Sequence, residues 1–160
     1  MSEADHVFFH EPVLTTEAVA ALDVVPGGRY IDCTLGGGGH AEAILERLGP
    51  EGRLLGIDAD PEAIAFASER LRRFGTAVVP VQGNFRDLAA IAQRHGFDQV
   101  RGILFDLGVS AHQLTAPYRG FSLQSDAPLD MRFSPEQKVT AADLVNNVSE
   151  QELADIIYRL

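Results

Sequence analysis

The 160-residue sequence has little cysteine, lysine or tryptophan: Cys33 and Lys138 are the single residues of their kinds, and tryptophan is absent. One cysteine excludes an internal disulfide and cannot build a cysteine-based zinc site, which is typical of a reducing compartment. No run approaches the roughly 20 consecutive apolar residues of a membrane-spanning helix. The acidic start, Ser2 to Asp5, also lacks the basic and apolar parts of a secretion signal. We therefore expect a cytoplasmic protein that does not enter a membrane.

Positive charge is also scarce. The 13 Lys plus Arg residues face 23 Asp plus Glu, which gives a formal net charge of -10. Because proteins hold a phosphate backbone through clustered Lys or Arg, this balance argues against a freestanding nucleic-acid-binding module. The hydrophobic content of 46% and the mean hydropathy of +0.00 are typical of a globular chain and exclude the disordered and low-complexity classes. The length suffices for one domain with its own core.

Short β-prone runs alternate with helical patterns from residue 29 to residue 106. Strands are predicted at residues 29–34, 53–58, 77–81 and 100–106, and helices at 41–48, 61–74 and 85–95. Strands that alternate with helices form a parallel, doubly wound sheet, so the expected fold class is α/β. In such a sheet the first strand lies beside the fourth, at the point where the strand order reverses.

The pattern changes after Asp106. Residues 107–133 contain glycines, prolines and scattered aromatics with no clear period, and a loop of this length in a compact domain is more often functional than idle. Helices are predicted at residues 140–147 and from Ser149, where Ser149 and Glu152 form a capping box. An apolar stripe then reaches the last residue with no terminating signal, at Leu153, Ile156, Ile157 and Leu160.

A glycine-rich loop follows the first predicted strand. Gly36, Gly38 and Ala41 satisfy the pattern G-x-G-x-x-G/A, and Asp58 follows about twenty residues later. This spacing is that of a dinucleotide-binding loop, and a nicotinamide-dependent oxidoreductase is one reading of it. The alternative without a function is a flexible turn. The flanking strand and helix, and the later Asp58, disfavour it.

Two details favour a different nucleoside ligand. Asp32 precedes the first glycine by four residues, and the polar pair Cys33-Thr34 replaces the apolar strand end usual in dehydrogenases. An acid at that position suits a cationic ligand such as S-adenosylmethionine, which has an ammonium and a sulfonium group. The helix N-terminus after Gly39 can hold its carboxylate. Asp58, at the end of the second strand, is placed to accept hydrogen bonds from the ribose hydroxyls.

Further candidates flank this loop. Asp106 ends the fourth strand, so its side chain is expected to face the ligand; the alternative is a helix N-cap. Phe85 could flank an adenine ring or belong to the core, and His40 could contact the carboxylate of the ligand. No pair of histidines has metal-binding helical spacing, so we expect no metal site. Solvated surface positions are expected for His6, His95, Arg70, Arg72 and Arg73.

Ordered motifs along nearly the whole chain resemble those of one family. They are His10–Leu14, Tyr30–His40, Leu54–Pro61, Asp106–Ser110, Arg119–Ser122 and Pro128–Arg132. Together they resemble the MraW family of bacterial small-subunit rRNA cytosine-N4 methyltransferases. The resemblance implies S-adenosylmethionine-dependent methylation of the exocyclic N4 amine of a cytidine in the decoding region of 16S rRNA. The implied partner is 16S rRNA in the small ribosomal subunit, and the oligomeric state is left open, with a dimer as one option.

The resemblance also implies residue roles and an architecture. The implied cofactor contacts are Gly38, Gly39, His40, Asp58, Phe85, Asp106 and Gln113. The implied fold is the class I methyltransferase, Rossmann-like sheet with an inserted helical domain. We therefore expect a methyltransferase core at residues 1–139 and the truncated start of the helical domain at residues 140–160. On this view the chain is an N-terminal fragment with four of seven strands, poorly stable and inactive by itself.

The chemistry of the target amine suggests catalytic residues. The N4 lone pair of cytosine is delocalised into the ring, so the site must supply acceptors for its hydrogens. The sequence Asp106-Leu107-Gly108-Val109 keeps the acid of the Asp/Asn-Pro-Pro-aromatic motif of amino methyltransferases and lacks the rest. Base stacking would then come from Tyr118, Phe121 or Phe133, while Asp130 and Arg132 join Asp106 as catalytic candidates that contact base or phosphate. The remaining alternative is a non-catalytic nucleoside-binding module.

Overall fold

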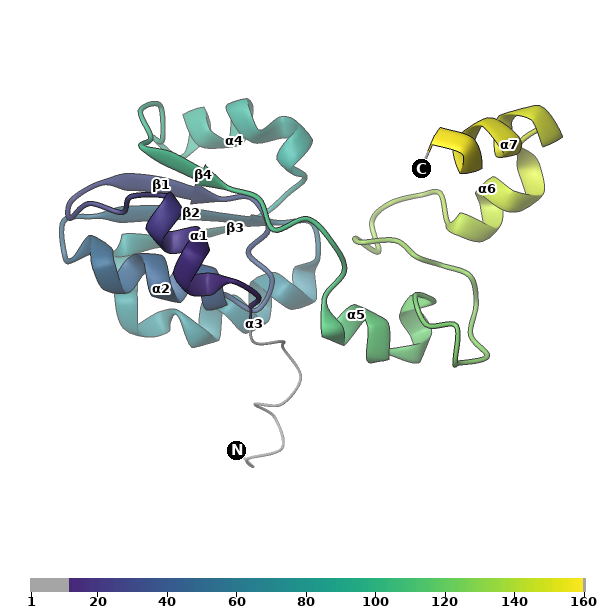
Figure 1. Cartoon of the computed structure of the whole chain (residues 1–160), viewed down its shortest axis with the longest axis horizontal. Helices are drawn as coiled ribbons and strands as arrows, with labels where there is room; N and C mark the ends of the chain where they lie inside the picture. The colour runs from purple at the N-terminus through teal and green to yellow at the C-terminus, as the bar shows by residue number, and fades with distance from the viewer. Residues whose placement is uncertain (1–11, 160) are drawn as a thin grey trace. The chain divides into compact units, whose positions relative to one another are not determined.

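The computed structural model describes residues 12–159. By its contacts the chain divides into two compact units, residues 1–108 and 109–160. The first unit contains a four-stranded parallel sheet in the order β3-β2-β1-β4 (Figure 1). The strands are β1 (Arg29–Asp32), β2 (Arg53–Asp58), β3 (Val78–Gln82) and β4 (Gly102–Leu104). The α/β prediction is confirmed, and β1 lies between β2 and β4 as expected.

Helices cover both faces of this sheet. The helices of the first unit are α1 (Thr15–Ala21), α2 (Gly39–Leu48), α3 (Pro61–Arg70) and α4 (Leu88–Arg94), with short 3-10 segments at η2 (Arg72–Ala77) and η3 (Phe85–Asp87). Figure 1 shows α1, α2 and α3 on one face and α4 on the other. The alternation of side chains along the strands explains this: Tyr30 and Leu54 pack with α1, α2 and α3, whereas Ile31 and Leu55 pack with α4.

Three elements of the first unit differ from prediction. Helix α1 was not predicted, and the helix expected at 61–74 ends at Arg70 and continues as the 3-10 segment η2. The strand expected at residues 100–106 is only Gly102–Leu104. It is short because its partner β1 ends at Asp32, and because the Asp106 N–H donates to the Thr34 hydroxyl at 2.7 Å instead of joining a ladder.

The second unit is helical. It consists of α5 (Ala111–Thr115), η4 (Pro117–Arg119), α6 (Ala141–Asn147) and α7 (Glu150–Arg159). Helix α5 lies in the stretch where the sequence showed no apolar period, and it was not predicted. A capping box between Ser110 and Gln113 starts this helix, not an apolar stripe. The predicted capping box of α7 is confirmed: the Glu152 carboxylate accepts from the Ser149 N–H at 2.9 Å, and the Ser149 hydroxyl accepts from the Glu152 N–H at 3.3 Å.

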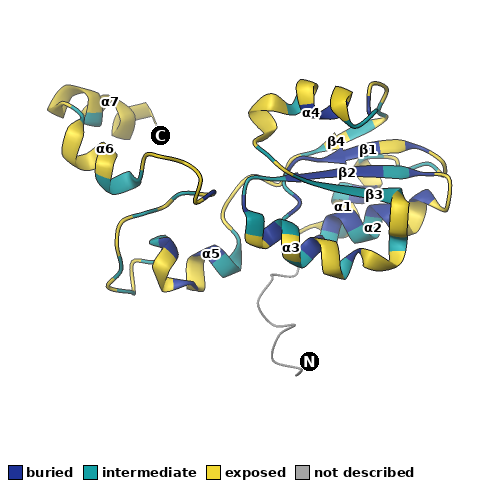
Figure 2. Cartoon of the chain, turned by 180° about the vertical axis from the view of Figure 1, so that it is seen from behind, coloured by how far each residue is buried: buried dark blue, intermediate teal, exposed yellow. Residues whose placement is uncertain are grey.

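Apolar side chains remain exposed at the edge strand β4 and on α7 (Figure 2). Ile103 is 40% exposed and Phe105 is 45% exposed, and Ile157 of the predicted α7 stripe is 70% exposed. Leu160, the last residue of that stripe, lies outside the described residues. Within residues 12–159, no helix has the length and apolar character needed to cross a membrane.

Candidate functional site

The glycine loop turns directly into the N-terminus of α2. Gly36 and Gly38 have φ values of 50° and 78°, in the left-handed region that favours glycine, and Gly38 is the N-cap of α2. Gly39 is required for a different reason, because a Cβ there would lie 2.5 Å from Cγ of Pro12. The glycines of the loop therefore place backbone groups, without side chains, at the carboxyl ends of the strands.

Asp58 at the end of β2 is tied to this loop. Its Oδ2 accepts a hydrogen bond from the Gly36 N–H at 2.8 Å, and its Oδ1 accepts from the Asp60 N–H at 2.9 Å. Burial raises the pKa of the carboxyl group, and these backbone hydrogen bonds oppose the rise. Each oxygen keeps a second lone pair, so Asp58 can still accept from a ligand hydroxyl. Its role in ribose binding stays a prediction.

Asp32 at the end of β1 is the least satisfied polar group of the site. Its side chain is fully buried. Its Oδ1 accepts from the Thr34 N–H at 3.0 Å, whereas its Oδ2 has no hydrogen-bond partner. Burial, with a smaller contribution from the negative charge of Asp58, raises the pKa of Asp32 to about 7. A cationic ligand group would satisfy this oxygen. The sequence singled out this acid, yet the residues implied by the family resemblance do not include it.

Asp106 and His40 lie close together beside Asp32. The Asp106 Oδ2 is 3.7 Å from the His40 Nδ1, with the carboxylate side chain 53% exposed and the imidazole 7% exposed. The Thr34 hydroxyl links the two acids, because it accepts from the Asp106 N–H and lies 3.4 Å from the Asp32 Oδ1. Asp106 is not a helix N-cap, since Ser110 caps the next helix. The structure thus gathers Asp32, His40 and Asp106 at the ends of β1 and β4.

Phe85 is neither isolated nor in the core. Its ring is 44% exposed and packs edge-on against Phe105, with the ring centroids 5.6 Å apart. Both rings lie just beyond strand ends, Phe85 after β3 and Phe105 after β4. The exposed Phe85 ring is compatible with flanking an adenine, and this role stays a prediction.

Arg70 holds the glycine loop from α3, which the sequence did not predict. Its guanidinium donates from Nε and Nη2 to the Glu42 Oε2 at 2.9 and 2.7 Å, and from Nη1 to the Gly37 carbonyl at 3.3 Å. Arg73 also pairs with Glu42, at 3.2 Å. The expectation of a solvated surface is wrong for Arg70, which is half-buried, and holds for Arg72 and Arg73, which are both exposed. Because Glu42 lies in the first turn of α2, its neutralisation favours an anion at that helix end.

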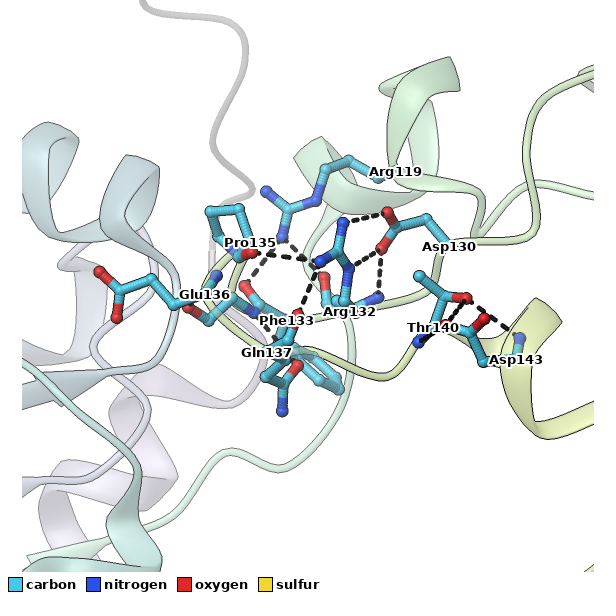
Figure 3. Close-up of polar contacts among 10 residues, drawn as sticks. Arg119, Asp130, Arg132, Phe133, Pro135, Glu136, Gln137, Thr140 and Asp143 are labelled. Atoms are coloured by element: carbon cyan, nitrogen blue, oxygen red, sulfur yellow. Dashed lines mark hydrogen bonds and ion pairs between the residues drawn. The ribbon is translucent and has the colours of Figure 1, made fainter. Parts of the chain in front are cut away.

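The second unit holds the remaining candidates. Asp130 and Arg132 form a bidentate ion pair, with Nε donating to Oδ1 at 2.8 Å and Nη2 to Oδ2 at 2.7 Å (Figure 3). This pairing lowers the pKa of Asp130. Gln113 is buried, and its side-chain Oε1 accepts from the Ser110 N–H at 3.0 Å. Its cofactor role stays a prediction.

The aromatic candidates of the second unit differ in exposure. Tyr118 is 58% exposed, and Phe133 is 40% exposed and packs on Phe121 with centroids 5.6 Å apart. Among the described residues, no cluster of three or more His, Cys, Asp or Glu side chains could hold a metal ion. His6 and His10 lie outside the described residues.

Comparison with known proteins decides the family. The model of the MraW methylase family matches residues 7–160. The chain belongs to the MraW methylase family. Ribosomal RNA small subunit methyltransferase H of Dehalococcoides mccartyi is 56% identical over 150 residues, which are 94% of this chain and 43% of that protein. The corresponding protein of Thermomicrobium roseum is 53% identical, over 94% of this chain and 46% of its own length. This MraW-family chain therefore spans less than half of these relatives.

Solved structures agree on the fold. A putative rRNA-methylase from Clostridium thermocellum superposes with a TM-score of 0.50 at 20% identity, covering 62% of this chain and 53% of its own. NSun6 from Pyrococcus horikoshii, solved with SFG, superposes with a TM-score of 0.51 at 22% identity, covering 60% of this chain and 24% of its own. The MraW-family chain thus has the class I, Rossmann-like methyltransferase fold that its sequence predicted.

The Arg70 contacts in this MraW-family chain give a first prediction. Arg70→Gln should weaken S-adenosylmethionine binding roughly fivefold, because the Gly37 carbonyl loses its anchor and the Glu42 charge opposes the ligand carboxylate. Isothermal titration calorimetry measures the affinity. Arg72→Gln, in a neighbouring exposed arginine, is the matched control and should bind as the unchanged chain does. Equal affinities for both variants would show that the Arg70 contacts do not support the site.

Proposed function

We propose that this chain carries the cofactor site of an S-adenosylmethionine-dependent methyltransferase that modifies the N4 amine of a cytidine in the decoding region of 16S rRNA. Membership of a methylase family and similarity to rRNA small subunit methyltransferases H support methyl transfer to small-subunit rRNA. The N4 atom and the decoding region come from the resemblance of the motifs. The observation that carries the proposal is the buried, unpartnered Oδ2 of Asp32 beside the glycine loop.

The residues of the first unit fit S-adenosylmethionine. When bound, this cofactor supplies an electrophilic methyl group. Asp32 would accept from its ammonium, and Asp58 would accept from its ribose hydroxyls. Gly38 and Gly39 keep side chains away from the N-terminus of α2, where the carboxylate would lie. An NAD pyrophosphate would bring further negative charge toward buried Asp32, so the oxidoreductase alternative is not favoured.

Asp106 would act on the target amine. The N4 lone pair becomes nucleophilic when an acceptor draws the amine hydrogens out of the ring plane. A carboxylate oxygen of Asp106 would accept one of these hydrogens and would take the proton as the amine nitrogen bonds to the methyl carbon, whose bond to the sulfonium sulfur breaks to leave a neutral thioether. His40 lies beside this carboxylate, with its Nδ1 3.7 Å from the Asp106 Oδ2. The exposure of Asp106 leaves room for a base beside it.

The one cysteine of this chain is poorly placed to attack a ring carbon. Methylation at C5 of a cytosine proceeds through a thiolate that attacks the ring. Cys33 is buried, and burial raises the pKa of its thiol to about 12. This thiol is protonated near neutral pH and does not reach a substrate, so it is a poor nucleophile.

The second unit would contact the rRNA substrate. Exposed Tyr118 and Phe133 are candidates to stack an unpaired base, and the target cytidine must leave its stack to react. We keep Gln113 as a cofactor contact and residues 140–160 as the start of a helical domain, both from the family resemblance. Asp130 and Arg132 are proposed to act at the substrate as an ion pair.

Equilibrium binding tests this proposal with the chain itself. The chain should bind S-adenosylmethionine, and S-adenosylhomocysteine should compete with it for the same site. NAD should bind at least roughly tenfold more weakly, because its pyrophosphate would approach the buried Asp32. Tighter binding of NAD would support the oxidoreductase alternative instead. Weak binding of S-adenosylmethionine would support the non-catalytic nucleoside-binding module, and binding of none of the three would contradict the proposal.

A further inference from the structure

A short turn in the second unit, residues 128–133, is fixed unusually firmly for a loop. Arg132 donates four of its five guanidinium N–H groups within the chain: two to the Asp130 carboxylate and one each to the carbonyls of Pro135 and Gln137, at 3.1 and 2.6 Å (Figure 3). The Asp130 Oδ1 also accepts from the Arg132 N–H at 3.0 Å. These bonds use most of the polar capacity of both side chains, so neither is well placed to bind a phosphate directly.

The backbone of the turn is held from two further sides. Buried Arg119 donates to the carbonyls of Arg132 and Phe133 at 3.3 and 3.0 Å, and its own carbonyl accepts from the Met131 N–H at 3.0 Å. Gly120 allows this close approach, since a Cβ there would lie 2.4 Å from the Pro128 carbonyl oxygen. On the other side, the Ala141 N–H at the start of α6 donates to the Asp130 carbonyl at 2.9 Å.

Met131 lies between Asp130 and Arg132 in the sequence, and the hydrogen bonds described above hold its backbone. Its φ of 57° lies in the left-handed region, which costs free energy for any residue with a Cβ. Its apolar side chain is nevertheless 42% exposed, so much of it is free to contact a partner. Strain that a surrounding framework enforces is typical of residues that contact a ligand.

We propose that Met131 is a substrate-contacting residue that packs against an unstacked rRNA base, with Asp130 and Arg132 as its positioning residues. This inference rests on the proposed function. A thioether side chain is apolar and adaptable, so it suits the face of a base. Phe133, two residues on, is 40% exposed and packs on Phe121, which places a second apolar side chain on the same rigid turn. Bases splayed out of a stack are recognised by such apolar surfaces.

The substitution Met131→Gly separates this role from a structural one. Glycine relieves the left-handed backbone, so a purely structural role predicts equal or higher thermal stability and unchanged binding. The proposal predicts equal or higher thermal stability with roughly tenfold weaker binding to small ribosomal subunits. Filter binding of the chain at one fixed salt concentration, beside a melting curve, measures both. Leu123→Gly is the control, because Leu123 is fully exposed and outside the turn, and it should bind as the unchanged chain does.

A double-mutant cycle tests the positioning pair. If Asp130 and Arg132 act only by holding Met131, then Asp130→Ala, Arg132→Ala and the double variant should lose affinity by the same factor. Additive losses would mean that each side chain contacts rRNA by itself and would overturn the positioning role. Affinity of Met131→Gly equal to that of the unchanged chain would overturn the contact. If the unchanged chain does not prefer small to large ribosomal subunits, the proposed function itself fails, and this inference with it.

Discussion

Replacing Asp32 by asparagine should stabilise the protein at pH 8 and remove most of its affinity for S-adenosylmethionine. The folded chain holds the Asp32 proton up to a pKa of about 7, whereas the ordinary value is 3.8. Between these two values the folded state binds more protons than the unfolded state, so the stability contributed by Asp32 is full below about pH 4 and is lost as the pH rises to about 7. Asparagine avoids this loss, which is at most about 4 kcal/mol above pH 7.

Two measurements check this prediction. Urea denaturation at pH 5 and pH 8 gives the free energy of unfolding, and the gain from Asp32→Asn should be larger at pH 8. Titration calorimetry should show roughly 100-fold weaker binding of S-adenosylmethionine, because the ligand ammonium loses its buried charged partner. Asp98→Asn, at an exposed position, is the control for both. An Asp32→Asn variant that is less stable at pH 8 would mean that Asp32 is ionised and already paired in the free protein.

Replacing Asp106 by asparagine should lower the rate of methyl transfer by roughly 10²- to 10⁴-fold at saturating S-adenosylmethionine. Asparagine keeps the size of the side chain and an oxygen acceptor, yet it cannot take the amine proton. The rate is best measured in a single turnover on small ribosomal subunits. Because this chain spans 43% of the Dehalococcoides mccartyi relative, the assay would use the chain continued by the remainder of that relative.

The same chimaera supplies the control for Asp106. Its Asp98→Asn variant should transfer the methyl group at the unchanged rate. A normal single-turnover rate for Asp106→Asn would exclude Asp106 as the proton acceptor and leave it, at most, a structural neighbour of His40.

The fold followed from the sequence where local patterns decide structure. Strand-helix alternation predicted a parallel sheet with β1 between β2 and β4, and the Ser149–Glu152 box predicted the start of α7. Helix α5 was not predicted because a helix of five residues is too short to show an apolar period. A capping box starts this helix. Strand β4 was predicted too long because apolar residues continue past the point where β1 ends.

The candidate site was predictable only in part. Parallel strands bring their carboxyl ends to one edge, so Asp58 and Asp106 could be placed from their positions after strands. The Arg70 contacts with Glu42 join residues 28 apart, and no local pattern signals such a pair. The missing partner of the Asp32 Oδ2 is likewise a property of the packed chain, although an acid before a glycine loop was a usable signal.

The decisive measurement is the chemical position of the methyl group on rRNA. Small ribosomal subunits that lack the modification would be incubated with S-adenosylmethionine and with either the 160-residue chain or the chimaera. Nuclease digestion and mass spectrometry would then locate the product. We expect one N4-methylated cytidine in the decoding region of 16S rRNA with the chimaera, and none with its Asp106→Asn variant. Methylation at C5, on a ribose hydroxyl or outside 16S rRNA would refute the proposed function.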